Sequence, residues 1–296
     1  MRFHCLHSGL NTDISARIEL LRSAATERGV EFCSIDSMRY DYTSVPRLGA
    51  GDIVYNAGRG SRELECLFLQ AGVTSFYHNL RYVDLATSTT HWSLLHQKYS
   101  IPVPTTIPHP TTDRELLRRY VEHLGGFPII IKVSGGSRGV GVIKLESLHS
   151  LFSTVDYLVS QGTGFILRRY IPSREVGRLI VVGTTVVAAV AYLSPDDDFR
   201  TSIAEQPVAV KREYPLDIQK LAVDATQLLG TDFGGVDIVT GPDGSSYVLE
   251  VNSPCSFQRT QRVSGVNVAG RMLDHLIAKS TDNLQTPFGV TAPFGK

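Results

Sequence analysis

Two acidic residues and an amide lie close together in a predicted β-hairpin. Val- and Ile-rich segments flank Asp243-Gly244, which is a strong signal for a two-residue hairpin turn. Such a turn places Asp237 and Glu250 directly opposite each other, where like charges destabilise a sheet, with Asn252 on the same face. These oxygen ligands suit Mg²⁺, which proteins hold through one or two carboxylates together with substrate phosphates. The pattern also fits an ordinary solvent-facing hairpin with incidental acids.

An apolar, strand-like segment ends at Lys132, and a glycine-rich loop follows it and extends to Gly141. Glycines let a backbone fold closely over an anion, and successive backbone N–H groups can cradle a phosphate. Lys132 adds a positive charge at the strand end. The glycines are not followed by Lys and Ser or Thr, so the loop is not of the Walker A type. An ordinary hairpin turn is the alternative interpretation.

Two arginines are candidates for binding the same phosphate. Arg178 begins an apolar strand, and Arg200 follows Asp198-Phe199 at the edge of a polar loop. Arginine is the preferred bidentate partner of phosphate. Each residue alone is typical of a protein surface, and only the hairpin and the glycine loop make them candidates.

The first eighty residues alternate strand and helix patterns, which predicts a small parallel sheet layer. Thr12 or Asp13 is expected to cap the first helix. A loop at 56–61 follows a strand end, where such folds usually bind ligands, and Arg59 within it is the candidate for holding a substrate carboxylate. The strands are expected at 3–6, 30–35 and 52–55.

Beyond a proline-rich linker at 100–110, the pattern is mixed. Asp217 is expected to cap one of the later helices. Helices are expected at 113–124, 148–158, 217–230 and 268–279, and strands at 127–132, 141–145, 165–171, 178–182, 186–192, 235–240 and 246–252.

The composition narrows the class of protein. Lys+Arg and Asp+Glu both total 29 in 296 residues, and this zero net charge argues against a nucleic-acid partner or a membrane surface. A hydrophobic fraction of 42% is sufficient for a core. The four cysteines are scattered, without a CxxC pair, which favours reduced thiols in a cytoplasmic protein. We expect a soluble chain, with a homodimer or homotetramer possible.

Taken together, the motifs resemble the ATP-grasp superfamily, and most closely the RimK-like carboxylate–amine ligases. The resemblance covers roughly residues 85 to 280. It rests on Lys132 with its glycine loop, Leu167–Ile171, Arg178–Gly183, Asp198-Phe199-Arg200, Gly235–Asp237, Glu250–Pro254 and Ser264–Met272.

The resemblance implies an α/β (α+β) chain with the ATP-grasp fold, in which two subdomains clasp ATP. The expected division is a parallel α/β subdomain at 1–87, a central lid subdomain at 88–162, a C-terminal subdomain at 163–285 that carries the metal hairpin, and a loose tail at 286–296.

It also implies a reaction, in which ATP phosphorylates a carboxylate and an amine then attacks the acyl phosphate, with release of ADP and phosphate. The carboxylate and amine would belong to small molecules or peptides. Arg178 and Arg200 would steady the transferred phosphate, and Asp237, Glu250 and Asn252 would hold Mg²⁺, with Mn²⁺ as an alternative. The implied ATP-binding residues are Lys132, Gly135, Gly136, Ser137, Gly139, Gly141, the hinge Arg168, Arg169, Tyr170 and Ile171 for adenine, and Glu175 for the ribose.

Three stretches depart from the family pattern. Ser88-Thr89-Thr90 stands where the family has an Asp-Lys pair, and Arg168-Arg169 stands where it has Gln-Glu. The segment 201–207 replaces an Asn and an Arg-Gly-Gly loop, so Ser202 becomes a substrate candidate and the substrate stays open. A peptide-tailoring or cyclising ligase and a nucleotide-binding protein without ligase activity are the alternatives.

Overall fold

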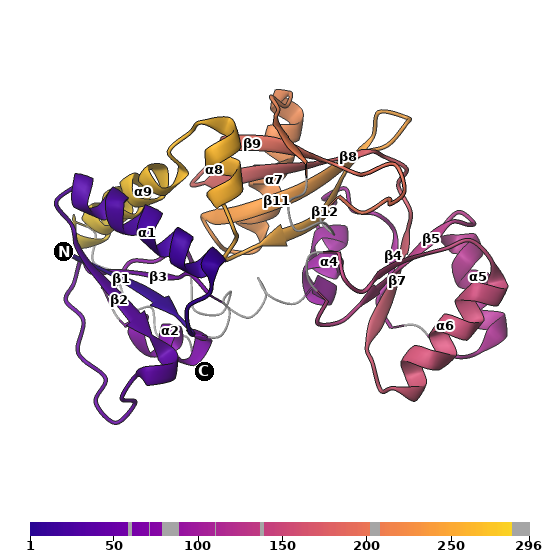
Figure 1. Ribbon diagram of the computed structural model, residues 1–296, viewed down its shortest axis with the longest axis horizontal. Helices are drawn as coiled ribbons and strands as arrows, with labels where there is room; N and C mark the ends of the chain where they lie inside the picture. Colours follow the sequence, from indigo (N-terminus) through magenta and orange to yellow (C-terminus); the bar gives the residue numbers. More distant parts are fainter. Residues whose placement is uncertain are drawn as a thin grey trace, which may run out of the picture.

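The computed structural model describes residues 1–58, 61–70, 72–78, 89–109, 111–136, 139–201 and 208–285. Within these ranges the strands form three sheets, which lie side by side along the longest axis of the molecule (Figure 1). We name the sheets by their order along the sequence: the N-terminal sheet is β2-β1-β3, the central sheet is β4-β7-β5-β6, and the C-terminal sheet is β10-β9-β8-β11-β12.

The N-terminal sheet is parallel, as predicted. Its strands are β1 (Arg2–His7), β2 (Glu31–Asp36) and β3 (Ile53–Asn56), and the accompanying helices are α1 (Thr12–Glu27), the short η1 (Ser37–Arg39) and α2 (Arg62–Phe68). The predicted cap of α1 is wrong by one residue. Asn11 is extended, and its side-chain oxygen accepts a hydrogen bond of 2.9 Å from Ile14 N. Asparagine is at least as favourable at an N-cap as the predicted Thr12 or Asp13, and the helix begins at the residue that follows Asn11.

The central sheet is antiparallel, and α5 and α6 pack against it (Figure 1). Its core contains Leu117, Ile131, Val155 and Leu167. The elements of this region are α4 (Thr89–Lys98), β4 (Thr106–Ile107), α5 (Arg114–His123), β5 (Ile129–Val133), β6 (Val142–Leu145), α6 (Leu148–Ser160) and β7 (Phe165–Arg169).

The C-terminal sheet is also antiparallel, and α7 buries Ala222 and Ala225 against Val236. Helix α7 follows Pro215, and no side chain caps it, so the predicted cap at Asp217 is wrong. Asp217 lies in the first turn instead, where a negative charge suits the helix dipole. The elements are β8 (Glu175–Val182), β9 (Thr185–Leu193), β10 (Ala209–Lys211), α7 (Leu216–Leu228), β11 (Phe233–Thr240), β12 (Ser246–Asn252), α8 (Gln258–Ser264) and α9 (Val268–Gln285).

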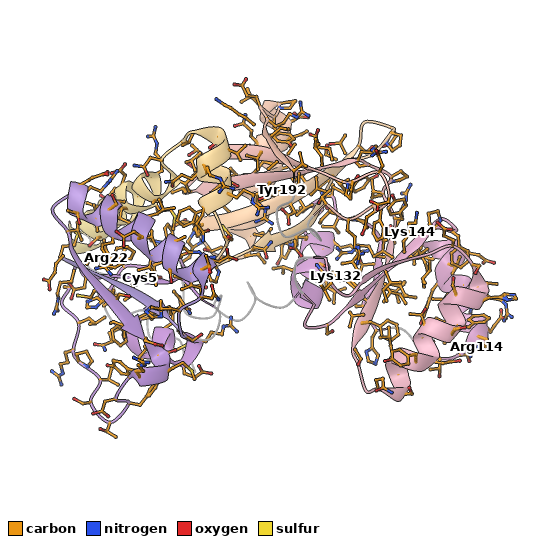
Figure 2. All side chains as sticks on the ribbon, viewed as in Figure 1. Cys5, Arg22, Arg114, Lys132, Lys144 and Tyr192 are labelled. Atoms are coloured by element: carbon orange, nitrogen blue, oxygen red, sulfur yellow. The ribbon has the colours of Figure 1, made fainter. Side chains whose placement is uncertain are left out.

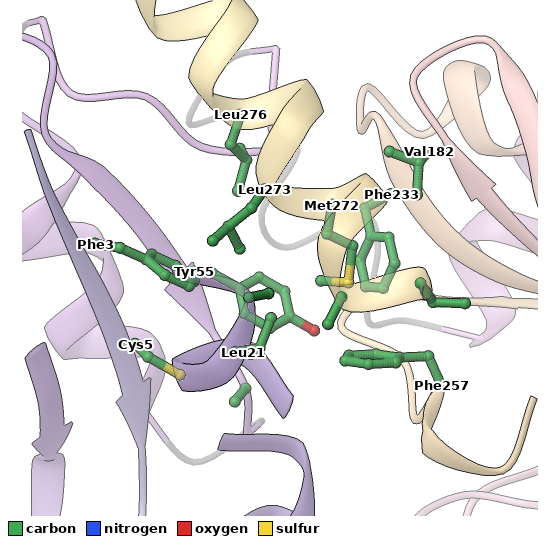
Figure 3. Packing of buried hydrophobic residues seen from close by; sticks show 14 of the residues in the cluster. Phe3, Cys5, Leu21, Tyr55, Val182, Phe233, Phe257, Met272, Leu273 and Leu276 are labelled. Carbon is green, nitrogen blue, oxygen red and sulfur yellow. The ribbon is translucent and has the colours of Figure 1, made fainter. Parts of the chain in front are cut away.

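One hydrophobic cluster joins the first and last parts of the chain. Phe3, Leu21 and Tyr55 of the N-terminal layer pack in it with Phe233 of β11 and Met272 of α9 (Figure 3). Arg28, the residue directly after α1, also pairs with Asp274 of α9 through bonds of 2.7 and 3.0 Å. The N-terminal layer and the C-terminal sheet therefore form one platform, because their apolar side chains are buried in a shared core.

The sheets do not follow the subdomain boundaries that we expected. Strand β7, beyond residue 162, pairs with β5 and completes the central sheet. Leu95 of α4, which was placed in the lid, packs against the C-terminal core. The expected tail at 286–296 lies outside the described residues. None of the helices in the described ranges is long and apolar enough to cross a membrane.

Candidate active site

A cavity of about 1440 Å³ opens between the central and C-terminal sheets and extends to α1 and α8. Drug-sized ligands usually fill pockets of roughly 300–1,000 Å³. The volume therefore leaves room for more than one ligand. Strands β5 and β7 line one wall, strands β8, β11 and β12 line another, and Lys132 lies between the two sheets (Figure 2).

The hairpin of β11 and β12 brings Asp237 opposite Glu250, as predicted, although its turn differs from the prediction. The loop comprises residues 242–244, because Gly241 N donates to Ser245 O at 2.9 Å. This longer loop alone would shift the register by one residue. A β-bulge at Leu249 shifts it back, because Val248 pairs with Ile238 and Glu250 pairs with Asp237.

The buried side chain of Arg168 contacts this bulge. Its Nη1 donates to the carbonyl oxygen of Leu249 at 3.0 Å. Its Nε donates to Thr106 Oγ1 at 3.1 Å and its Nη2 to Ser93 Oγ at 2.9 Å. Burial lowers the pKa of Arg168 to about 10, with Glu250 acting in the opposite direction. Arg168 thus connects β7 to the β11–β12 hairpin by its side chain, a role that the sequence did not indicate.

Four charged side chains form a row across the cavity floor. Arg178 lies beside Asp237 in the pairing of β8 with β11, and its Nε and Nη2 donate to the two carboxylate oxygens at 2.5 and 2.8 Å. Glu250 accepts from Lys132 Nζ at 2.5 Å and from Asn252 Nδ2 at 2.9 Å. The repulsion expected between the facing acids is therefore offset, since each acid has a basic partner.

The two acids differ in their preference for a proton. Burial raises the pKa of Asp237 to about 6 despite Arg178, and the neighbouring Glu250 adds to the increase. Burial would also raise the pKa of Glu250, but the Lys132 ammonium and the Asn252 amide hold it well below its usual range. The pKa of Arg178, which burial would lower, is raised by Asp237. Glu250 is thus the more firmly ionised acid of the pair.

These residues fit a divalent cation that prefers oxygen ligands. Asp237 and Glu250 are partly buried, with side chains 13% and 29% exposed, and both line the cavity together with Asn252. No group of three or more His, Cys, Asp or Glu residues suited to a metal occurs in the described part of the chain. Two carboxylates and an amide therefore leave several coordination positions open, which is typical of Mg²⁺ held partly by phosphate.

The glycine loop lies over the cavity, where Gly136 and Gly139 line it. A side chain at Gly136 is excluded, because a Cβ there would lie 2.2 Å from Val140 O. Gly135 and Gly141 have φ values of 79° and 83° and do not line the cavity. Ser137 lies outside the described residues.

Arg200 reaches this loop from the polar segment after β9. Its Nη1 lies 3.4 Å from Gly139 O, and Asp198 holds its guanidinium through contacts of 2.7 to 3.2 Å. The side-chain hydrogen bonds with Asp198 raise the pKa of Arg200. Arg200 is thus a fixed positive charge beneath the glycine loop.

The predicted hinge lines the apolar end of the cavity. Arg169, Tyr170 and Ile171 all face it, together with Ile130 and Val239. Phe199 packs edge-on against Tyr170, with ring centroids 6.1 Å apart. An apolar wall beside an extended backbone suits a flat aromatic base.

Some predicted residues lie elsewhere. Glu175 does not line the cavity, because its carboxylate accepts from Arg212 at 2.5 and 3.2 Å and from Tyr214 at 3.3 Å. Arg59 and Ser202 lie outside the described residues, as does the side chain of Thr89.

Arg17 was not among the site residues predicted from the sequence, although it lines the cavity from α1. The available signal was its spacing. Ile14, Ile18 and Leu21 form the apolar face of α1, and Arg17 falls within that face rather than opposite it.

Solved structures of ATP-grasp ligases share this fold. An ATP-grasp ligase, PsnB, complexed with a minimal precursor superposes with a TM-score of 0.70 at 21% identity and covers 94% of this chain and 99% of its own. A D-alanine–D-alanine ligase from Bacillus anthracis gives a TM-score of 0.67 at 15% identity, covering 96% and 99%. The predicted ATP-grasp fold is confirmed.

Comparison of the sequence with known families identifies the family to which the chain belongs. Residues 89–276 match the RimK-like ATP-grasp domain, and the chain belongs to this family. A probable alpha-L-glutamate ligase of Enterobacter sp. is 30% identical over 191 residues, 64% of this chain and 62% of that protein. A ribosomal protein bS6–L-glutamate ligase of Salmonella paratyphi B is 28% identical over 244 residues, 80% and 77% of the two chains. The predicted enzyme class, the ATP-dependent carboxylate–amine ligases, is confirmed at the level of the family.

Proposed function

We propose that this protein is an ATP- and Mg²⁺-dependent ligase that activates a carboxylate as an acyl phosphate and joins it to an amine. The observation that carries the proposal is the row Arg178, Asp237, Glu250 and Lys132 on the floor of a cavity large enough for a nucleotide and a second substrate.

The cavity lining suggests one direction for the nucleotide. Its base would lie against Tyr170 and Ile171, and its phosphates would lie near the glycine loop, Lys132 and Arg200, because all of these line the same cavity. Glu175 is too engaged with Arg212 to hold the ribose in this arrangement. Backbone N–H groups of glycine-rich loops can cradle phosphate oxygens, which is the role proposed for this loop.

Asp237, Glu250 and Asn252 would hold Mg²⁺, and Mn²⁺ would replace it. When bound, the cation neutralises negative charge on the phosphate oxygens. Lys132 would give up its bond to Glu250 when a cation takes that carboxylate, and its ammonium would then be free to pair with phosphate. Arg178 keeps Asp237 oriented through its two parallel bonds.

The reaction proceeds in two transfers. An oxygen of the substrate carboxylate attacks the terminal phosphorus of ATP, the bond to ADP breaks, and an acyl phosphate forms. The amine then attacks the acyl carbon, the bond to phosphate breaks, and the proton from the amine nitrogen passes to the released phosphate to leave an amide. Arg178 and Arg200 stabilise charge on the phosphoryl oxygens, since both lie beside the cavity as fixed guanidinium groups.

The names of the relatives suggest the substrate class. L-Glutamate ligases join an amino acid, one of them to a ribosomal protein, and we propose an amino-acid or peptide substrate here. A peptide-tailoring ligase is the alternative, which the structural neighbour PsnB with its precursor peptide favours. All four cysteines are free thiols, which supports a cytoplasmic location.

ADP release is the test. The protein is incubated with Mg–ATP and a panel of peptide carboxylates paired with amino acids, and the amide product is identified by mass spectrometry. The carboxylate alone can give at most the first transfer, so sustained release of ADP together with the amide should require both substrates. An Asp237→Asn variant is the control for contaminating ATPase, because it removes a proposed metal ligand. Absence of ADP above the control for every pair would leave a nucleotide-binding protein instead.

A further inference from the structure

Arg17 is a buried guanidinium without an acidic partner. Its residue is only 8% exposed, and it lies on α1 in the wall of the cavity. Nη1 donates to the carbonyl oxygen of Ala57, while Nε has no hydrogen-bond partner. Among the described residues, no carboxylate lies within ion-pairing distance of this guanidinium, although the other buried arginine near the reaction centre, Arg178, has one.

Arg17 lies on α1, on the side of the cavity away from β5 and β7, where the nucleotide is proposed to bind (Figure 1). Cys255 also lines the cavity and lies near both arginines: burial raises the pKa of its thiol to about 11, and the Arg178 and Arg17 guanidinium groups oppose the increase. Close packing places Cys255 beside Arg178, since a Cβ on Gly235 would lie 2.9 Å from Cys255 Cβ and 3.3 Å from Arg178 Cδ. The same cavity extends past Cys255 to Arg17.

Burying a cation without a partner is unfavourable, and proteins usually pair such a charge or bind a ligand there. The loop after β3 holds Arg17 in place, because Ala57 accepts its bond and Asn56 fixes the loop by accepting from Gly58 N at 3.0 Å. Nη1 is engaged by this loop, which leaves the rest of the fork to meet an anion from the cavity.

The anion is not the phosphate of ATP, because Lys132 and Arg200 already lie beside the glycine loop at the other end. A planar carboxylate matches the guanidinium fork. We propose that Arg17 binds a substrate carboxylate other than the one that is activated, so that Arg17 selects an amino acid or an acidic peptide. This inference rests on the proposed function.

The proposal is tested by binding, without turnover. Melting temperatures are measured with saturating Mg–AMPPNP and one probe at a time. One arm uses L-glutamate, L-glutamine and isoglutamine, so that each carboxylate is removed in turn from an amine substrate. The second arm uses N-acetyl-glutamyl-glutamate and its C-terminal amide, which vary a carboxylate of a peptide substrate. The arm that responds identifies which substrate carries the anion.

Three variants accompany the parent. Arg17→Met removes the charge, and Arg17→Lys keeps the charge but not the planar fork. Arg22→Met is the matched control, because Arg22 is an exposed arginine on the same helix, its guanidinium lies over the Phe32 ring, and it does not line the cavity (Figure 2). Arg17→Met should weaken the carboxylate probe about tenfold or more relative to its amide, with Arg17→Lys intermediate and Arg22→Met unchanged.

Stability without ligand separates a binding role from a structural role. Removing an unpaired buried charge should leave the melting temperature of Arg17→Met equal to or above that of the parent. If Arg17→Met does not fold, the proposal is tested by Arg17→Lys, through its affinity for the acid probe relative to the amide.

Equal effects on acid and amide, or no preference for an acid in the parent while AMPPNP still binds, would overturn the proposal. The outcome that would contradict the ligase proposal is a different one: ADP release would be absent, although the protein would still prefer the acid probe to its amide.

Discussion

Lys132 of β5 and Glu250 of β12 form an ion pair of 2.5 Å that joins the central sheet to the C-terminal sheet across the cavity. Phosphate competes with Glu250 for Lys132, and a divalent cation competes with Lys132 for Glu250. Because both ligands must break the same pair, we expect Mg²⁺ and ATP to bind more tightly together than separately.

Amide hydrogen exchange in the glycine loop should slow when nucleotide binds. Gly136 and Gly139 line the cavity, and the side chain of the neighbouring Val140 is exposed, so a bound phosphate would add contacts to this segment. Hydrogen exchange followed by mass spectrometry should show increased protection at 133–141 with Mg–ATP. The surface helix α6 provides the internal control. Unchanged exchange in the loop at saturating nucleotide would count heavily against its role over the phosphates.

Arg200→Lys should reduce turnover more than nucleotide affinity. The substitution keeps the charge but loses the fork that Asp198 and Gly139 now hold. If Arg200 acts on charge that develops in the transition state, kcat falls strongly while the Kd of Mg–ATP changes little. Steady-state kinetics and calorimetry measure the two quantities. Near-normal turnover would make Arg200 an ordinary surface residue.

Arg168 should support the hairpin through the Leu249 carbonyl. Arg168→Met removes the hydrogen bonds to Thr106, Leu249 and Ser93 and should cost about 2–4 kcal/mol of unfolding free energy. Mg²⁺ affinity should fall as well, because the bulge sets the position of Glu250. Urea unfolding and Mg²⁺ titration measure both. Arg169→Met changes the exposed neighbour and should alter stability by less than about 0.5 kcal/mol. Equal stability of the two variants would remove Arg168 from this role.

Glu65 should make stability depend on pH. Burial raises the pKa of Glu65 to about 7, although Asn56 donates to its carboxylate at 3.0 Å. The folded state therefore holds a proton that the unfolded state releases, so stability should fall as pH rises from about 4.5 to 7. The full shift corresponds to about 3 kcal/mol. Urea unfolding at pH 5 and pH 8 should show this fall in the parent and in exposed Glu63→Gln, but much less in Glu65→Gln.

Periodicity predicted most helices and strands correctly, because each depends on local side-chain patterns. The hairpin pairing of Asp237 with Glu250 was correct for a different reason from the one assumed, since the three-residue loop and the bulge shift the register in opposite directions. The carbonyl of the bulged residue Leu249 accepts a hydrogen bond from Arg168, which is distant in sequence. No local pattern could predict that contact.

The partners of the site residues were likewise beyond the sequence. Arg178 was predicted as a phosphate ligand, but its bond to Asp237 follows from the pairing of β8 with β11, which no motif specified. The role of Arg17 requires knowing that the loop after β3 closes on α1. Such contacts depend on tertiary packing, which single-sequence patterns do not report.

The metal hairpin is the centre of the account, and Glu250→Gln tests it most directly. Without ligand, the variant relieves repulsion on Asp237 but leaves Lys132 without its acidic partner, so its melting temperature should equal or fall slightly below that of the parent. Addition of Mg–AMPPNP should raise the melting temperature of the parent and of exposed Glu27→Gln strongly, because the ligand stabilises in proportion to its affinity. Glu250→Gln should gain much less. An equal gain in Glu250→Gln would show that Glu250 does not hold the metal and would contradict the proposed site.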